Sequence, residues 1–260
     1  MSEKALEQQF LEAVERAKAP LIVLSAFPNI DDYVTAYSVA SLLSKLQKPV
    51  QIVTKGGVAP KELGFLGQTD PIKGDLQQLK KLTIKVKSSH AKIDNLSYDI
   101  DGDTLAIHLE PKTGMWQPGD VEILTDSYKH DLIITIGVQE LEQIGELFQQ
   151  YQDFFFDIPL INIDHKTDNG HFGQINLVDI SHVSCSEVVF AAFKSIDESL
   201  LDETIATYLL TGMIAKTRSF KGPQVTPKTL KAASDLMARG ARRDDIVEHL
   251  YKTRSVETLR

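Results

Sequence analysis

The sequence is poor in the residues on which cross-linked or membrane-anchored proteins depend. Cys185 is the one cysteine among 260 residues, which rules out an intrachain disulfide framework and a cysteine-based zinc site. No apolar run approaches the roughly 20 residues that cross a bilayer, and residues 1–10 lack the basic and apolar regions of a signal peptide. These absences predict a soluble protein of the reducing cytoplasm, without a membrane partner.

Positive charge is also scarce. The chain carries 28 Lys and Arg against 36 Asp and Glu, a formal net charge of -8. Non-specific nucleic-acid binding needs clustered positive charge, so an extended nucleic acid is not an expected partner, although a local basic pocket for one nucleotide remains open. A mean hydropathy of -0.14 and 42% hydrophobic residues are typical of a globular protein with a sizeable core. The length fits one α/β domain, alone or with an insertion.

Short apolar runs alternate with helical patterns along most of the chain. This alternation predicts an α/β fold with a mostly parallel, doubly wound sheet and right-handed crossovers. Asp31 or Asp32 is the expected N-cap of the second helix. Strands are expected at 21–24, 49–54, 131–138 and 160–164, and helices at 3–18, 31–46, 140–151, 188–193, 201–215 (amphipathic), 226–240 and 244–251.

One region departs from the parallel pattern. Residues 82–87, 96–100 and 105–109 alternate apolar and polar side chains, which predicts an antiparallel hairpin or meander with one solvated face. We therefore interpret residues 82–125 as a small antiparallel β insertion in a domain that spans residues 1–260. A structural subdomain, a partner-docking surface and a cover for the substrate all remain open as its role.

Residues 160–169 are the most informative stretch, because the apolar run Leu160 to Ile163 is followed at once by polar side chains. In an open α/β sheet, ligands bind in the crevice at the carboxyl ends of the strands. If the predicted topology is correct, four segments meet at this crevice: 25–32, 137–139, 164–169 and 212–220.

The order and spacing of these segments resemble the DHH phosphoesterases, which include RecJ-like nucleases, nano-RNA and cyclic-dinucleotide phosphodiesterases, and related inorganic pyrophosphatases. The resemblance rests on four segments. Residues 163–166 lie where the family has Asp-His-His, and residues 211–220 are similar to its Gly-Ile-x-x-Asp-Thr-x-x-Phe segment. The other two segments are residues 184–187 and 225–250. In that family two manganese or magnesium ions clamp a phosphate and generate hydroxide from bound water. The resemblance implies the same fold for most of the chain outside the insertion.

The first two metal motifs of the family are poorly kept. Its His-x-x-x-Asp-x-Asp motif aligns with Ala26, Ile30 and Asp32, so that one carboxylate survives, and a one-residue slip would let Asp31 substitute for another. The bridging Asp of the second motif falls at Gly137. Because divalent ions need a dense set of carboxylates and imidazoles, the resemblance implies that the first metal site is lost.

The third and fourth motifs keep half of their ligands. Asp164 and the metal-binding His165 are present, but Lys166 replaces the second His and Lys216 replaces the last Asp. A lysine ammonium beside a cation costs on the order of several kcal/mol in a partly buried site. The resemblance therefore implies a degraded centre with no assigned catalytic residue and no cofactor. The open alternative is one weakly held Mn²⁺ or Mg²⁺ on Asp31, Asp32, Asp164 and His165.

The lysines suggest what the crevice could still do. Lys166, Lys216 and Arg218 are candidate phosphate-binding residues, since ammonium and guanidinium groups are good phosphate donors. Lys216 could instead occupy the vacated metal position and neutralise Asp32 or Asp164, and simple solvation of the lysines is the third possibility.

The other reactive side chains carry weaker signals. His165 is expected to hydrogen-bond Asp164. Cys185 is expected to be a small buried residue, because no base stands at a recognisable spacing from it. The remaining histidines with no metal-ligand spacing are expected at the surface or at caps: His108, His130, His171 and His182.

The expected function is therefore non-catalytic: a phosphoesterase-like pseudoenzyme that binds a phosphorylated small molecule, a nucleotide or a protein partner. The rival is an active metal-dependent phosphoesterase with a reduced metal site, and a scaffold without any ligand is the third hypothesis. A homo-oligomer is compatible with the sequence. The family's phosphodiesterases also have a carboxy-terminal substrate-binding domain, which residues 1–260 do not include, so that an open crevice is expected.

Overall fold

The structure is a computed structural model that describes residues 5–67, 72–76 and 78–252, and the chain divides into two compact units. The larger unit comprises residues up to 77 and from 130 onward, and the smaller comprises residues 78–129. The larger unit contains a five-stranded parallel sheet in the order β2-β1-β7-β8-β9. The predicted fold class, a mostly parallel α/β sheet with a small antiparallel insertion, is confirmed.

The strands of the parallel sheet are short and buried. All residues of β1, β7 and β8 are buried, as continuous apolar runs predict for strands covered on both faces. β9 was not predicted, because a four-residue segment with one buried residue has no distinctive pattern. The bounds are β1 Pro20–Leu24, β2 Gln51–Val53, β7 Leu132–Ile136, β8 Leu160–Asp164 and β9 Ile175–Val178.

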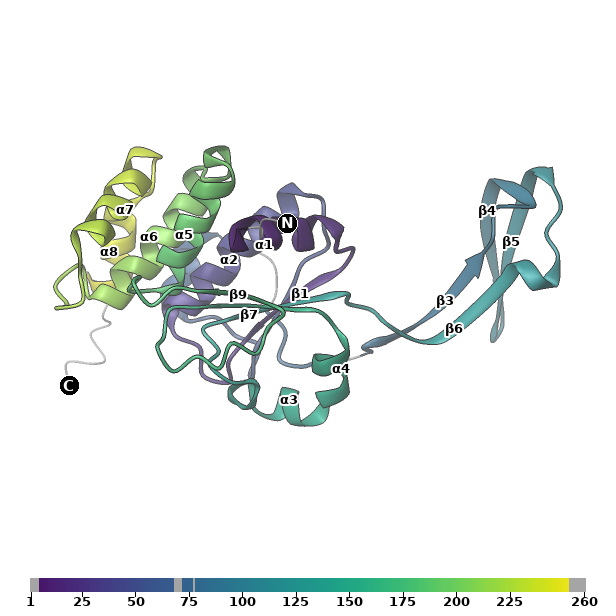
Figure 1. Cartoon of the computed structure of the whole chain (residues 1–260), viewed down its shortest axis with the longest axis horizontal. Coiled ribbons are helices and arrows are strands. Elements are labelled where there is room, and N and C mark those ends of the chain that lie inside the picture. The colour runs from purple at the N-terminus through teal and green to yellow at the C-terminus, as the bar shows by residue number, and fades with distance from the viewer. Residues whose placement is uncertain (1–4, 68–71, 77, 253–260) are drawn as a thin grey trace. The chain divides into compact units, whose positions relative to one another are not determined.

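Helices cover both faces of this sheet (Figure 1). α2, α5 and α6 lie on one face and pack against one another, whereas α3 and α4 lie on the other. The principal apolar cluster fills the space between the sheet and α2, α5 and α6. The bounds are α1 Leu6–Arg16, α2 Ile30–Lys45, α3 Glu146–Gln150, α4 Gln152–Asp157, α5 Cys185–Ile196, α6 Glu203–Thr217, α7 Pro227–Ala238 and α8 Arg243–Val247.

Three helix predictions were wrong in detail. The N-cap of α2 is Asn29, and Asp32 completes its capping box from the third helical position. The helix expected over 140–151 is interrupted by Gly145, whose φ of +75° separates a 3₁₀ turn from α3. The amphipathic pattern expected for α6 is absent, because every residue from Ile205 to Ile214 is buried between neighbouring helices. In the described part of the chain, no helix combines the length and apolarity required to cross a membrane.

The order of the strands creates a switch point in the sheet. The chain leaves β2 on one side of β1 and returns as β7 on the other side. The loops that follow β1 and β7 therefore run apart, and such a divergence opens a crevice at the carboxyl ends of the strands. The candidate site is expected at this position.

The smaller unit consists of two separate antiparallel ribbons. β3 (Lys80–Val86) pairs with β6 (Val121–Tyr128), and β4 (Ala91–Asp101) pairs with β5 (Thr104–Gly114) through a turn at Gly102, which has a φ of +55°. The antiparallel pairing was predicted, but the expectation of one solvated face was wrong. In β4 the polar and the apolar side chains after Ala91 are all exposed. Each ribbon has two strands, and neither of its faces is covered by another described element of the smaller unit.

Candidate functional site

A cleft of about 360 Å³ lies at the switch point of the parallel sheet. Its walls come from the loop after β1, the first turn of α2, the loop after β7 and the loop after β8. Asn29, Asp32, Gly137, Gln139 and Lys166 are among the residues that line it. Three of the four segments that the sequence placed at one crevice, 25–32, 137–139 and 164–169, therefore do meet there.

Asp32 lines the cleft and is 3% exposed. Its Oδ2 accepts a hydrogen bond of 2.9 Å from the Asn29 amide, while Asn29 Oδ1 accepts from the amides of Asp31 and Asp32. Burial, and next the charge of Asp31, raise the pKa of Asp32 to about 7, against lowering contributions from the Asn29 amide, Lys166 and Lys216. The carboxyl group of Asp32 thus titrates near neutral pH.

Gly137 leaves room for Asp32. This glycine has a φ of +68°, and a Cβ atom on it would lie 2.2 Å from Asp32 Oδ1. Contacts shorter than 3.0 Å essentially never occur for real Cβ atoms, so that any larger residue at 137 would displace the Asp32 side chain. The space beside Gly137, where the resemblance would place the family's bridging carboxylate, is therefore occupied by the side chain of Asp32.

Asp31 is directed away from the cleft, toward α5. Its Oδ2 accepts from the Cys185 amide at 2.8 Å and its Oδ1 from the Ser186 amide at 3.1 Å. These are amides at the start of α5, where the helix dipole favours a negative charge. Gly212 of α6 packs on the same carboxylate, since a Cβ on it would lie 2.4 Å from Asp31 Oδ1. Asp31 thereby joins α2, α5 and α6, and the fourth predicted segment reaches the site through Gly212.

Asp164, at the end of β8, is held by a network of hydrogen bonds. Asn169 Nδ2 and Gln139 Nε2 donate to its Oδ2 at 2.8 and 3.3 Å, and the His165 amide donates to its Oδ1 at 2.8 Å. Burial raises the pKa of Asp164, but the hydrogen bonds from His165, Asn169 and Gln139 outweigh it and bring the pKa to about 2. Asp164 is therefore ionised throughout the physiological range.

His165 and Cys185 face each other beside these carboxylates. His165 Nδ1 lies 3.5 Å from Asp164 Oδ1 and 3.5 Å from Cys185 Sγ. Burial, followed by the charges of Asp31, Asp32 and Asp164, raises the pKa of the Cys185 thiol well above its usual range. Cys185 is thus a buried, protonated thiol, as the sequence led us to expect of it.

One group of potential ligands was not foreseen. An oxygen of Asp31, a ring nitrogen of His165 and the sulfur of Cys185 lie within 4.8 Å of one another. The single cysteine excluded a zinc site built from several cysteines, but it does not exclude a site that combines one thiol with an imidazole and a carboxylate. These three side chains are the described group whose ligand atoms lie close enough together to reach one metal ion.

The two crevice lysines approach Asp32 from different elements. Lys166 follows β8 and Lys216 is in the last turn of α6, and both charges lower the pKa of Asp32. Across the described residues, neither ammonium forms an ion pair within 4.0 Å. The close ion pair between Lys216 and a crevice carboxylate, one of the hypotheses from the sequence, is therefore not formed among them.

Arg218 lies in a different setting from these lysines. It is exposed and begins a left-handed turn, with φ values of 52°, 57° and 61° at Arg218, Ser219 and Phe220. Its charge acts on Tyr251, whose pKa is raised by burial and partly lowered again by Ser219 and Arg218. The charges of Lys166 and Lys216 thus act on Asp32, while that of Arg218 acts on Tyr251.

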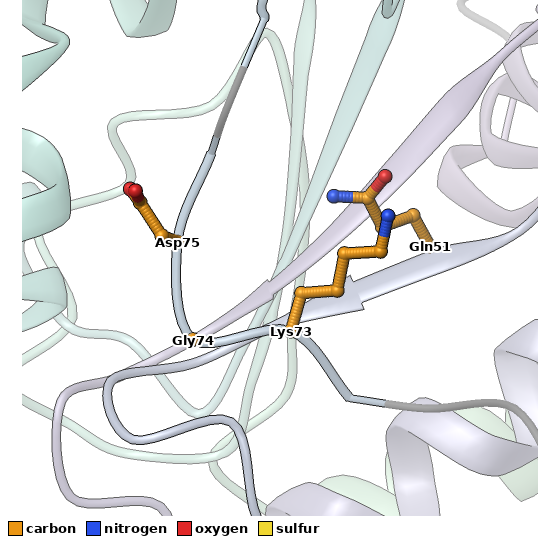
Figure 2. Close-up of a pocket in the computed structure, with 4 residues that line it drawn as sticks. All are labelled: Gln51, Lys73, Gly74 and Asp75. Atoms are coloured by element: carbon orange, nitrogen blue, oxygen red, sulfur yellow. The ribbon is translucent and has the colours of Figure 1, made fainter.

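A second pocket, of about 420 Å³, lies at the edge of the sheet and is lined by Gln51, Lys73, Gly74 and Asp75. In the view of Figure 2 the Gln51 and Lys73 side chains extend toward each other, whereas the Asp75 side chain points away from both. Gln51 opens β2 and Lys73 pairs with Val53 at the other end of that strand, so this pocket lies along the edge strand of the sheet. The residues that line it are different from those that line the cleft at Asp32. Lys73 is therefore a lysine in a different pocket, and its substitution can serve as a control for substitutions of Lys166 and Lys216.

The other histidines divide into two groups. His108 and His171 are exposed, as predicted, but His130 and His182 are buried, which corrects the expectation of a surface position. His182 lies between two carboxylates, with Nε2 3.3 Å from Asp179 Oδ2 and Nδ1 3.4 Å from Glu187 Oε1.

Three amide side chains at the site were missed: Asn29, Gln139 and Asn169. Asn29 could have been recognised, because Asn directly before an apolar helical pattern is a common N-cap. Asn169 donates to Asp164 and to Val138 O and accepts from Asn162 Nδ2 and the His171 amide. Its place in a polar run was the available signal, but its partners depend on the three-dimensional fold.

Sequence comparisons find similar proteins for parts of the chain. A bifunctional oligoribonuclease and PAP phosphatase from Thermus thermophilus is 31% identical over 91 residues, which are 35% of this chain and 28% of that protein. A protein of the same description from Bacillus subtilis is 27% identical over 135 residues, 51% of this chain and 42% of that protein. The matches thus span less than half the length of these relatives. No protein-family model matches the chain.

The fold as a whole has a counterpart among solved structures. An exopolyphosphatase-related protein from Bacteroides fragilis superposes with a TM-score of 0.72 at 19% identity, covering 99% of this chain and 63% of that one. At this identity the likeness concerns the fold alone. Together with the sequence relatives, it confirms the resemblance on which the motif assignment rests.

Proposed function

We propose that this chain, which resembles the DHH phosphoesterases, is a non-catalytic member of that group whose crevice binds the phosphate of a phosphorylated small molecule or nucleotide. The observation that carries this proposal is the pair Lys166 and Lys216. Both act on Asp32, and neither has an ion-pair partner within 4.0 Å among the described residues. Lys166 lines the cleft and the charge of Lys216 reaches Asp32, and ammonium groups are good donors for a phosphate.

The state of Asp32 supports an anionic ligand. A carboxyl group whose pKa is about 7 is largely protonated in mildly acidic solution. A neutral Asp32 neither repels a phosphate nor competes with it for the lysines. The cytoplasm is the proposed location, since Cys185 remains a thiol there.

The donor set does not fit the two-metal centre of the related phosphoesterases. Position 137 cannot supply the bridging carboxylate while Asp32 occupies the space beside its Cα. Asp31 uses both oxygens to accept amides at the start of α5, where the positive end of the helix dipole disfavours a cation. Lys216 adds a further positive charge near Asp32. No catalytic step through a pair of metal ions is therefore derived for this chain.

The relatives suggest the class of ligand. The Thermus thermophilus and Bacillus subtilis proteins are described as oligoribonuclease and PAP phosphatase, and both descriptions concern phosphorylated substrates. A crevice with lysines at positions 166 and 216, where the resemblance places metal ligands, would retain a phosphate without hydrolysing it. A protein partner at the same crevice is the alternative ligand that a negative result with phosphates would favour.

Isothermal titration with inorganic phosphate and with AMP tests this proposal. We expect saturable binding, weakened about tenfold by Lys166→Ala and by Lys216→Ala, because a charge-assisted hydrogen bond contributes roughly 1.5 kcal/mol. Lys73→Ala, in the second pocket (Figure 2), is the matched control and should change the affinity less than about twofold. Absence of binding by the unmodified chain, or equal weakening by all three variants, would refute the proposal.

A second candidate function is an active phosphoesterase with one metal ion, and the proximity of Asp31, His165 and Cys185 favours it. Elemental analysis after purification with manganese and zinc present separates the two. Stoichiometric metal that His165→Ala removes, together with hydrolysis of a generic phosphodiester, would establish this alternative and exclude the pseudoenzyme.

A further inference from the structure

The smaller unit, residues 78–129, has almost no hydrophobic core of its own. Among its described side chains, the buried apolar ones are Leu79 and Ala91. Its strands form two separate two-stranded ribbons, β3 with β6 and β4 with β5 (Figure 1). An isolated two-stranded hairpin is marginally stable in water, and a hydrophobic face packed against something else is needed for independent stability.

The β4–β5 hairpin presents such a face. Its cross-strand pairs on one side are Leu96 with Leu109, Tyr98 with Ile107 and Ile100 with Leu105. The exposed fractions of Leu96, Tyr98, Ile100, Leu105 and Ile107 are 64, 66, 71, 58 and 47%. We call these five residues, together with the partly buried Leu109, the ribbon face.

The opposite side of the same hairpin is polar. Ser97 pairs there with His108, and Asp99 pairs with Ala106. His108 Nε2 also lies 3.2 Å from Asp99 Oδ2. Because the alternation places all the larger apolar side chains of this segment on one side, the ribbon face has a defined orientation.

The size of the ribbon face decides what it can bind. Five side chains that each expose on the order of 100 Å² give a patch of about 500 Å², near the upper end of what monomeric proteins expose. When two such faces cover each other, about 1,000 Å² is removed from water, which is the lower limit for a specific interface. The face is thus just large enough for a symmetric pair.

We propose that the ribbon face is a dimerisation surface, which packs against the same face of a second copy of this chain. The face contains no charged residue, so that two identical faces approach without repulsion, although the chain has a net charge of -8. A two-fold axis brings the same patch of both subunits together, and β-ribbons pack face to face with interdigitated apolar side chains. This proposal is independent of the ligand of the crevice.

Sedimentation analysis of the full chain tests the proposal. We expect a dimer of the 28.9 kDa chain whose dissociation constant is raised at least about 100-fold by Tyr98→Lys with Ile107→Lys, since buried aromatic and aliphatic anchors dominate interface energies. The matched control is Ser97→Lys with His108→Lys, the adjacent cross-strand pair on the polar side. It adds the same residues to the same strands and should leave the dissociation constant within about threefold.

Cross-linking provides a second measurement that does not depend on disruptive substitutions. The single native thiol, Cys185, is buried, so an engineered cysteine on the hairpin would be the reactive one. Tyr98→Cys should give a covalent dimer with a short bis-maleimide, whereas Ser97→Cys on the polar side should remain mostly monomeric.

Three results would overturn the proposal. One is a monomeric unmodified chain at all concentrations, which would mean that another part of the same chain or a different protein covers the ribbon face. Another is a dimer that the Tyr98 and Ile107 substitutions leave intact, which would place the interface elsewhere. The third is a Ser97→Cys variant that cross-links as efficiently as the Tyr98→Cys variant.

Discussion

Replacing Gly137 by alanine is the most direct test of how tightly the crevice is packed. A Cβ at this position would lie 2.2 Å from Asp32 Oδ1 and 2.6 Å from Asp32 Cγ, so the Asp32 side chain must move. Overpacking of this kind costs about 1–3 kcal/mol, and the positive φ adds roughly 1–2 kcal/mol. Loss of the Asp32 bond to the Asn29 amide adds about 1 kcal/mol.

The expected total is a loss of about 3–6 kcal/mol in the free energy of unfolding, measured by urea titration with far-UV circular dichroism. Gly67→Ala is the matched control, because Gly67 has a φ of +67° and a Cβ on it would meet nothing within 4 Å. This control should lose the backbone cost alone, roughly 1–2 kcal/mol.

A double-mutant cycle isolates the contact with Asp32. In an Asp32→Ala background the clash is absent, so that Gly137→Ala should cost no more than the Gly67 control. If Gly137→Ala costs the same with and without Asp32, or no more than Gly67→Ala in the unmodified chain, the reasoning about the filled position is wrong.

Three further predictions concern the same crevice. Because the pKa of Asp32 is raised from 3.8 to about 7, the folded state favours the protonated carboxyl group. The free energy of unfolding should therefore fall as the pH rises from about 4 to about 7, by on the order of 4 kcal/mol in all. Urea titrations across that pH range should show that Asp32→Asn removes this pH dependence. Asn169→Ala should lower the free energy of unfolding by about 2–4 kcal/mol, since it leaves buried partners unsatisfied, whereas the exposed neighbour Asp168, replaced by alanine, should change it by less than about 0.5 kcal/mol. Gly137→Asp combined with Lys216→Asp should show no manganese-dependent hydrolysis of a phosphodiester, because the first metal site would still lack its His and first Asp; measurable turnover would show that the motif alignment is wrong.

The parts of the fold that the sequence predicted are those with strong local patterns. The run Leu21 to Leu24 and the run Leu160 to Ile163 are strands because continuous apolar segments of this length must be buried on both faces. The alternation at 96–109 gives the β4–β5 pairing. Gly145 shows the limit of this approach: the apolar spacing of 140–151 fits a helix, but the positive φ at one glycine divides it.

The sequence predicted where in the fold the candidate site lies, but it did not predict the hydrogen bonds within the site. The resemblance to the DHH phosphoesterases brought Asp32, Lys166 and Lys216 into one crevice; in the structure Asp32 and Lys166 line the same cleft, and Lys216 is near enough to lower the pKa of Asp32. The amides that hold Asp164 and the opposed thiol and imidazole of Cys185 and His165 were not foreseen. Such contacts join residues that are far apart along the chain, and no local spacing reveals them.

The smaller unit is inserted in a way that should change the stability of the parallel sheet very little. Its first and last strands pair from Lys80 and Tyr128 onward, and the Lys129 amide donates to Leu79 O, so that the chain leaves and re-enters at one point. Even without this closure, tripling the length of a connection costs only about 1 kcal/mol in loop entropy. The smaller unit can therefore change its length or its surface in evolution while the crevice of the parallel sheet stays the same.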